Sequence, residues 1–319
     1  MENEITESKN YKLSFKGQGK AFFGIVIVNW LLTFITLGMY YPWAKAKSLK
    51  YIFGATSFNN ERFTFHGTGK EMFGGFIKVV IFLVVTYGLA FLFSYFDMTF
   101  IGSLIFYFSM ISFFAIAIHA SYSYGLSRTS WRGIRFGYRG NRTELYVGYF
   151  KWIFFTVISL GVWGSWMAMK VRGYCLNNVR AGNVEIKYRG MGTEYFRLNL
   201  KGFLLTLITL GVYGFWWQKN RFAYSVNNLS LYKEGQQIRF KSTATAGDFF
   251  KLNMINLLQF IFTLGLGYAW IVVRTMNVLT SNIKMEGNMD LDTIRQTEED
   301  FNEDTEEDKS GFLDINFIF

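Results

Sequence analysis

The sequence predicts a mainly α-helical, polytopic membrane protein that is built from a repeated unit. Of its 319 residues, 51% are hydrophobic and 20% are aromatic. Charged residues make up 18% of the chain, against about 25% in an ordinary soluble domain. The single cysteine cannot form an intramolecular disulfide. This composition favours long apolar helices in a membrane.

A short strand followed by a helical hairpin recurs about five times, at intervals of about 50 residues. Each copy opens with an alternating apolar stretch that is typical of a strand, such as KLSFKGQG at Lys12 and RFTFHGTG at Arg62. An apolar run of helical length follows each stretch. The five copies are predicted at residues 12–61, 62–133, 134–183, 184–237 and 238–283.

Four copies carry a Leu-Gly break and then a tryptophan, as in TLGMYYPW ending at Trp43. Glycine allows the tight turn that joins two helical arms, and tryptophan is typical of the membrane interface. Structural or interfacial roles are therefore predicted for Gly38, Gly161, Gly211, Gly265, Trp43, Trp166, Trp216 and Trp270.

The second copy lacks this break and contains two longer arms. It runs from Met72 to Phe96, turns at Asp97 and returns from Thr99 to about Tyr124. About 20 apolar residues cross the hydrocarbon of a bilayer, so both arms are predicted to span it. The shorter arms of the other copies leave open whether they span, re-enter or lie at the interface.

Lysines and arginines fill nearly every connection between the apolar runs, whereas the connection at Asp97 has none. Because basic residues stay on the cytoplasmic side, we expect hairpins that return to one side and both termini in the cytoplasm. The short cytoplasmic strands are expected to pair, if at all, into a small sheet.

We predict a polar segment at 1–11, a membrane domain at 12–283 and an acidic, disordered tail at 284–319, which could recruit a protein partner.

The combination of a strand, an F-x-G-x-G turn, a helix and a T-L-G-x-Y-x-x-W break resembles the YjgN-like family of bacterial inner-membrane proteins, a domain family of unknown function. The resemblance covers about Lys12 to Asn282, with its best matches at FTFHGTGKEMFGG from Phe63 and TLGMYYPWAKAK from Thr36. It implies a multi-pass protein of the bacterial cytoplasmic (inner) membrane. It brings no activity and no catalytic residues.

After each tryptophan, the returning arm repeats aromatic and basic residues at intervals of four, which places them on one face of a helix. The simpler interpretation is an interfacial belt whose basic groups reach the lipid head groups. A second interpretation is that several arms converge on a basic cavity for an anion. The candidate ligand-binding residues are Lys47, Lys170, Lys219, Arg221 and Arg274.

His119 is a further candidate, because an ionisable residue inside an apolar helix is often functional. A neutral histidine that is hydrogen-bonded to a neighbouring helix is the simpler interpretation. The G-x-G turns at Gly17, Gly67 and Gly190 precede helices whose amides could hold phosphate, although tight-turn geometry explains these glycines equally well.

Two functions agree with these patterns. A transporter or channel for a small or lipidic anion would use the repeats and the basic arms. A scaffold or lipid-binding protein that conducts nothing would need only the aromatic and basic belts, with the bilayer and its anionic lipids as partners.

Two histidines and one cysteine exclude the common zinc and thiol sites, so we predict no enzyme, no catalytic residue, no metal and no cofactor. The basic residues are dispersed as topology signals, which argues against nucleic acid as a partner.

Overall fold

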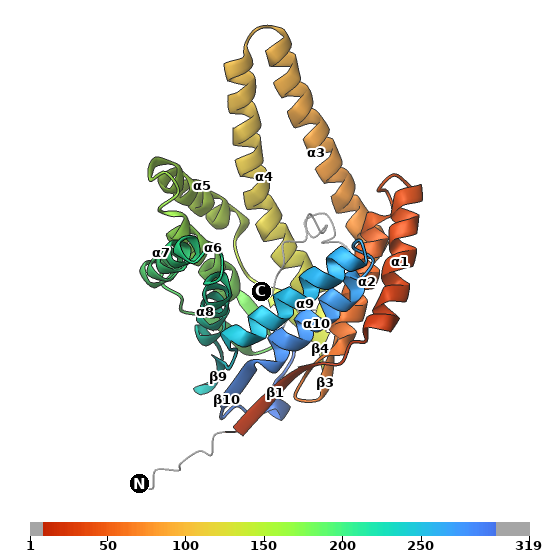
Figure 1. The fold of residues 1–319 in the computed structure, drawn as a ribbon, viewed down its shortest axis with the longest axis vertical. Coiled ribbons are helices and arrows are strands. Elements are labelled where there is room, and N and C mark those ends of the chain that lie inside the picture. The colour runs from red at the N-terminus through yellow and green to blue at the C-terminus, as the bar shows by residue number, and fades with distance from the viewer. Residues whose placement is uncertain (1–8, 298–319) are drawn as a thin grey trace.

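The computed structural model describes residues 9–297 and combines a closed β-barrel with a ring of helices at one of its ends (Figure 1). The same order of elements, strand, helix, helix, strand, recurs five times along the described chain. In this range, ten antiparallel strands form the barrel and ten α-helices leave it as five pairs. One pair projects far beyond the others at the top of Figure 1.

Each unit contributes two strands and the helix pair between them. The first has β1 (Lys9–Phe15), α1 (Gly19–Ile35), α2 (Tyr41–Ala55) and β2 (Thr56–Phe58). The second has β3 (Glu61–Phe65), α3 (Gly69–Tyr95), α4 (Thr99–Ser127) and β4 (Thr129–Trp131). The third has β5 (Ile134–Tyr138), α5 (Arg142–Ile158), α6 (Gly164–Asn177) and β6 (Val179–Ala181). The fourth has β7 (Val184–Tyr188), α7 (Gly192–Ile208), α8 (Gly214–Asn227) and β8 (Leu229–Lys233). The fifth has β9 (Gln236–Ser242), α9 (Ala246–Phe262), α10 (Tyr268–Ser281) and β10 (Ile283–Gly287).

Neighbouring strands in the barrel are neighbours in the sequence, and β1 pairs with β10 to close the ring. Tight turns join consecutive units. Between β2 and β3, Asn59 and Asn60 have φ angles of 49° and 69°, a left-handed conformation that asparagine tolerates better than most residues. The helix pairs join the two strands within each unit. All helices therefore leave one end of the barrel, the helical end, and the tight turns lie at the other, the turn end.

The predicted polytopic helical fold with a small sheet is wrong. The sequence patterns showed the strand that opens each unit and missed the strand that closes it. Three of the closing strands, β2, β4 and β6, have three residues each, too few to show a clear alternation. With both strands of every unit paired, the sheet closes on itself and has no exposed edge. Among the described helices, only α3 and α4 are long and apolar enough to cross a membrane.

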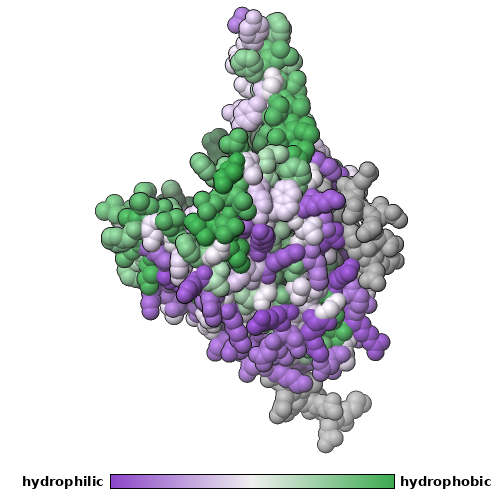
Figure 2. All heavy atoms as spheres, turned by 90° about the vertical axis from the view of Figure 1, so that its right-hand side faces the viewer, coloured by the Kyte–Doolittle hydropathy of each residue, from purple (hydrophilic) through white to green (hydrophobic). Residues whose placement is uncertain are grey.

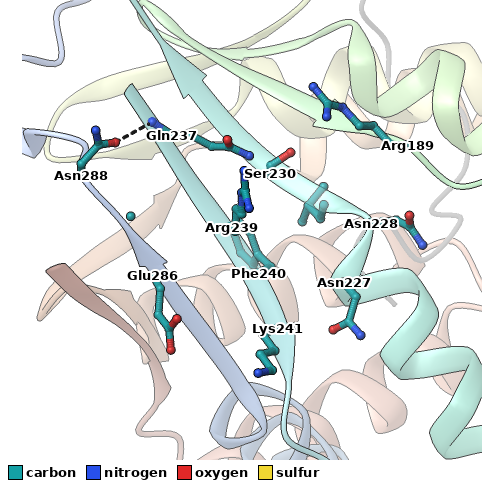
Figure 3. A pocket seen from close by; sticks show the side chains of 12 residues that line it. Arg189, Asn227, Asn228, Ser230, Gln237, Arg239, Phe240, Lys241, Glu286 and Asn288 are labelled. Atoms are coloured by element: carbon teal, nitrogen blue, oxygen red, sulfur yellow. Dashed lines mark hydrogen bonds between the residues drawn. The ribbon is translucent and has the colours of Figure 1, made fainter. Parts of the chain in front are cut away.

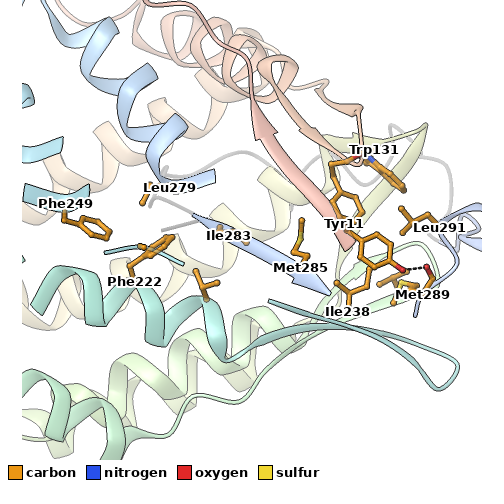
Figure 4. Packing of buried hydrophobic residues seen from close by; sticks show 14 of the residues in the cluster. Tyr11, Trp131, Phe222, Ile238, Phe249, Leu279, Ile283, Met285, Met289 and Leu291 are labelled. Atoms are coloured by element: carbon orange, nitrogen blue, oxygen red, sulfur yellow. Dashed lines mark hydrogen bonds between the residues drawn. The ribbon is translucent and has the colours of Figure 1, made fainter. Parts of the chain in front are cut away.

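Side chains that point into the barrel form a hydrophobic core (Figure 4). Alternate residues of a strand face the same side, which places Ile238 of β9 and Met285 of β10 inside, with exposures of 0% and 2%. Trp131 of β4 joins this core, and its indole N–H donates to the carbonyl of Phe58 at 3.2 Å. The core thus ties the first, second and fifth units together.

A strap of residues 288–296, which includes the short helix η1 (Leu291–Thr293), crosses the turn end of the barrel. Met289 and Leu291 of the strap are buried in the hydrophobic core. At the far end of the strap, Arg295 exchanges two hydrogen bonds of 3.1 Å with Asn183. The Asn183 N–H donates to the Arg295 carbonyl, and the Arg295 N–H donates to Asn183 Oδ1. The strap therefore reaches from β10 to the turn between β6 and β7.

The disordered tail predicted from residue 284 begins too early. Residues 284–287 belong to β10, and the strap follows them. The prediction was based on the acidic composition of the whole segment. It therefore overlooked three apolar residues near its start that the barrel buries, Met285, Met289 and Leu291. Residues 298–319, which contain most of the predicted acidic tail and its predicted contact with a partner, lie outside the described residues.

Four helix pairs turn at the Leu-Gly break with one geometry. The leucine has a φ of 49° to 51° and the glycine a φ of 87° to 96°. The hydroxyl before the leucine accepts the N–H of the residue that precedes the next helix, as when Thr36 Oγ1 accepts the N–H of Tyr40 at 3.0 Å. The four leucines are 91% to 94% exposed; they are Leu37, Leu160, Leu210 and Leu264. An exposed leucine in a left-handed conformation is unfavourable in water, whereas hydrocarbon accepts the side chain readily.

Tryptophans of the returning helices join one unit to the next. In three places the indole packs against the glycine that begins the next helix pair, where a Cβ atom would lie 2.2 to 2.3 Å from the ring Cδ1. The pairs are Trp43 with Gly69, Trp166 with Gly192, and Trp270 with Gly19. Three of the four predicted tryptophans thus lie between units, and Trp270 closes the ring. The fourth, Trp216, is exposed and stacks on Tyr213 of its own unit.

Cys175 on α6 is buried, and burial raises the pKa of its thiol to about 12. Such a thiol is protonated at pH 7 and shielded from reagents. We expect the folded protein to resist maleimide labelling and the SDS-denatured protein to be labelled completely, as measured by intact mass. Rapid labelling of the folded protein would contradict this packing.

Candidate functional site

The barrel and its inner helices enclose a chamber of about 660 Å³, within the range of about 300–1,000 Å³ that is common for ligand pockets. Strands from all five units line it, together with the helices that return to the barrel, α2, α4, α6, α8 and α10. At the turn end its floor is formed by the strap residues Met289, Leu291 and Ile294.

The wall of the chamber within the barrel is mainly apolar. Leu13, Phe63, Phe136 and Leu231 point inward from four different strands and are only partly buried, because they face the hollow. Protein interiors are normally close-packed, and side chains beside a void lose dispersion contacts. A chamber of this size is therefore suited to an apolar occupant that restores those contacts.

The helical end of the chamber is polar and reaches the surface. Arg172 on α6 lines it and donates from Nη1 to the Ser225 hydroxyl on α8 at 2.6 Å. Its guanidinium also lies over the ring of Tyr188, 5.5 Å from the centroid. Arg221 and Gln218 on α8 line the same end, and Arg221 is exposed. The chamber thus changes from apolar in the barrel to basic and polar between α6 and α8.

Of the basic residues predicted to converge, the structure places Arg221 at the chamber and the others elsewhere. Lys47 is exposed and donates to the Tyr40 hydroxyl at 2.7 Å. Lys170 is exposed on α6, and Lys219 donates to the neighbouring Asn220 at 3.4 Å. Arg274 forms hydrogen bonds with Asn256 and Gln259 of α9, at 2.7 and 2.8 Å. None of these four lines the chamber.

His119 on α4 is half-buried and lies outside the chamber wall. Its Nε2 is 3.0 Å from the carbonyl oxygen of Gly140, and its ring meets the Tyr138 ring edge-on. The hydrogen-bond partner of His119 thus lies in the turn between β5 and α5, and not in a neighbouring helix.

Arg172 is the residue at the chamber that the sequence analysis missed. It lies six positions after Trp166, whereas the five basic candidates lie three to five positions after the tryptophan of their own arm. A count of charged residues along the whole returning arm would have included it.

The G-x-G turns are occupied by the protein itself. Tyr51, Tyr174 and Tyr224 lie on the returning helices, and the hydroxyl group of each bonds the residue that precedes the first helix of the same unit. Each hydroxyl accepts the N–H of that residue and donates to its carbonyl, at 2.6 to 2.9 Å. The glycine of each turn lies against the aromatic ring of the strand, so that a Cβ at Gly17 would be 2.4 Å from the Phe15 ring. These contacts explain the turns by packing.

A second hollow, of about 710 Å³, lies along β8, β9 and the end of β10 (Figure 3). Arg189, Arg239 and Lys241 bring positive charge to it, and Glu286 offsets part of that charge. It is a polar hollow on the side of the strands that faces solvent, whereas the chamber is enclosed by the barrel. In the described part of the chain, no group of three or more His, Cys, Asp or Glu residues is arranged to hold a metal ion.

The outer surface is divided in the opposite sense to the chamber. Hydrophobic residues gather on the projecting pair α3 and α4 and on the upper parts of the other helices, and hydrophilic residues cover the barrel (Figure 2). At the tips, Ile208 and Phe262 are 74% and 81% exposed. An apolar surface of this extent marks a membrane or protein contact.

The fold and the chamber define a membrane protein in which a closed barrel, ringed by apolar helix pairs, holds an apolar chamber with a basic mouth. The chain belongs to a bacterial protein family of unknown function, DUF898, whose family model matches residues 10–189 and 217–308. The predicted relationship to the YjgN-like proteins is confirmed by this match and by the relatives described next.

The inner membrane protein YjgN of Salmonella typhimurium is 34% identical over 148 residues, which are 43% of this chain and 34% of the relative. YjgN of Escherichia coli K12 is 38% identical over 73 residues, which are 23% of this chain and 18% of the relative. The chain thus spans about a third or less of the length of these relatives. Their names and the two long apolar helices support the predicted inner-membrane location. No solved structure matches the chain.

Proposed function

We propose that this protein binds a long acyl chain from the inner membrane inside its barrel, as a lipid-binding protein. The observation that carries the proposal is the chamber of about 660 Å³, which is apolar within the barrel, is covered by the strap at one end and has the polar residues of α6 and α8 at the other. Removal of each CH₂ group from water contributes about 0.8 kcal/mol. This contribution is the same in the bilayer and in an apolar chamber, so an acyl chain can pass from one to the other without losing it.

The arrangement of apolar surface supports a specific orientation. The helices α3 and α4 cross the membrane, and the turn at Asp97 lies on the far side. The four leucine tips of the shorter pairs dip into the near leaflet, because their arms of 14 to 17 residues are shorter than the roughly 20 residues of a span. The barrel, its basic connections and both termini then lie in the cytoplasm, as basic residues favour.

The predicted channel or transporter for an anion draws less support from the geometry. A conducting path needs polar groups along its length, whereas the barrel wall is apolar and its turn end is covered by the strap. Four of the five basic candidates also lie away from the chamber. A lipidic anion fits the chamber better than a small hydrophilic one.

Native mass spectrometry of protein extracted gently from its own membrane tests the proposal. We expect a bound molecule with a long acyl chain in the wild type. The variant Leu231→Trp fills the chamber with a larger side chain and should lose that molecule. Thr64→Trp, on the exposed face of β3, is the matched control and should keep it.

The contrary result is equally clear. If the wild type carries no acyl chain, or Leu231→Trp binds as much as Thr64→Trp, the chamber is not a lipid site. The scaffold without a ligand, which the aromatic and basic belts alone can serve, would then be the better proposal.

A further inference from the structure

We propose that Arg172 and Arg221 form an anion site at the mouth of the chamber, and that the ligand is a single-chain amphiphile with a terminal carboxylate or phosphate. This inference rests on the proposed function, because it assigns the head group of the chain that the barrel holds. The two arginines lie on α6 and α8 and both line the chamber at its helical end.

The two helices are held together at this point. The hydrogen bond of 2.6 Å from Arg172 Nη1 to Ser225 Oγ joins α6 to α8. Ser225 follows Arg221 by four residues, so the two side chains lie on the same face of α8, one turn apart. The Arg221 guanidinium lies over the ring of Trp217, 5.8 Å from the centroid, as the Arg172 guanidinium lies over Tyr188. Stacked guanidinium groups are held in place and keep donors available for a further acceptor.

Among the described residues, no carboxylate forms an ion pair with Arg172 or Arg221. The basic partners of the ion pairs in this part of the chain are Arg128, Arg132, Arg180 and Lys187 instead. A cation beside an apolar hollow is costly without an anionic partner. A carboxylate or phosphate accepts from arginine in a bidentate manner and would supply that partner.

The order of the groups along the chamber determines the class of ligand. The apolar barrel lies below the arginines, and the strap closes it at Met289 and Leu291. A ligand with its anion at the arginines therefore directs one apolar chain into the barrel. One anionic group at the arginines and one apolar chain in the barrel meet both parts of the lining, and a single-chain amphiphile is the smallest ligand that supplies both.

Titration of delipidated, full-length protein with three probes of equal chain length tests the inference. Hexadecanol reports the apolar chamber alone, palmitate adds a carboxylate, and palmitoyl lysophosphatidic acid adds a phosphate. We expect the wild type to bind at least one anionic probe about tenfold or more tightly than hexadecanol, since hydrogen bonds between arginine and an anion are stronger than those to a neutral hydroxyl. The anion that binds more tightly identifies the source of the ligand.

Variants then assign the preference to the two arginines. Arg172→Gln and Arg221→Gln should each lower the affinity for the anionic probes several-fold and leave the affinity for hexadecanol unchanged. The double variant should bind all three probes with the same affinity. Lys170→Gln removes the same charge from an exposed position on α6 and should keep the preference. Arg221 is exposed, so its variant is expected to fold even where Arg172→Gln does not.

Failure of the inference is distinct from failure of the proposed function. If the wild type binds hexadecanol and the anions equally, or if Lys170→Gln abolishes the preference as fully as the arginine variants, the anion site is refuted and the apolar chamber stands. If the wild type binds none of the three probes, both proposals fail.

Discussion

The substitution Gly192→Ala is expected to destabilise the protein by about 1–3 kcal/mol, as overpacking of a close contact does. Gly192 is the first residue of α7, and a Cβ there would lie 2.3 Å from Trp166 Cδ1 and 2.8 Å from its Cα. The ring can rotate away, whereas the backbone of Trp166 cannot move without shifting α6. The melting temperature, followed by fluorescence in a mild detergent, should therefore fall.

Gly173→Ala is the matched control for this prediction. Gly173 lies inside α6, and a Cβ there meets no atom within 4 Å. Because alanine favours a helix interior over glycine by about 1 kcal/mol, this variant should be as stable as the wild type or more so. Addition of Trp166→Ala to Gly192→Ala removes the clash with the ring and leaves the clash with the backbone, so a double-mutant cycle should show partial compensation. Equal stability of Gly192→Ala and Gly173→Ala would show that the tryptophan does not join the units.

The substitution Met289→Ala is expected to cost about 2–5 kcal/mol, the range for removal of a large buried side chain. Met289 is 1% exposed, and its carbonyl accepts the hydroxyl of Tyr11 from the opposite end of the chain. Loss of its side chain should loosen the strap and the closure of β1 on β10 together. Thermal unfolding measures the loss, and hydrogen exchange should locate the faster amides in β1, β10 and the strap.

Asp292→Ala provides the comparison within the same strap. The Asp292 side chain is 80% exposed and forms an ion pair of 2.9 Å with Arg132. Exposed pairs of this kind contribute about 0–1 kcal/mol, so this variant should resemble the wild type. If both variants unfold like the wild type, the strap does not stabilise the barrel; if both are equally damaged, its ion pair matters as much as its core packing.

Several local features could be predicted because nearby residues determine them. The Leu-Gly break requires glycine for its positive φ angle, and the break lies between two helices at each of the four predicted places. The two long arms of the second unit correspond to α3 and α4, since a run of apolar residues of that length is an unambiguous signal. The opening strands at Lys12 and Arg62 were found because alternation over several residues has a recognisable period.

The candidate site could be predicted only in part. The sequence led to Arg221 and missed Arg172, because helical spacing shows which residues share a face and not which of two faces meets another helix. The other four basic candidates do not line the chamber. Lys47, Lys219 and Arg274 form hydrogen bonds elsewhere, and Lys170 is exposed to solvent. Convergence of side chains from different units depends on how the units are arranged around the barrel.

By itself, the sequence determined the membrane class, the two helices long and apolar enough to span a membrane, the turns at Leu-Gly and the family, since each follows from composition or from contacts within a short stretch. The tertiary structure alone decided that the sheet closes into a barrel, that the strap covers one end and that a chamber remains inside. The closing strands are too short to be recognised singly, and they become strands because neighbours in the ring supply their hydrogen bonds. A hollow, in turn, is a property of how all five units pack around a common axis, and no single stretch of residues encodes it.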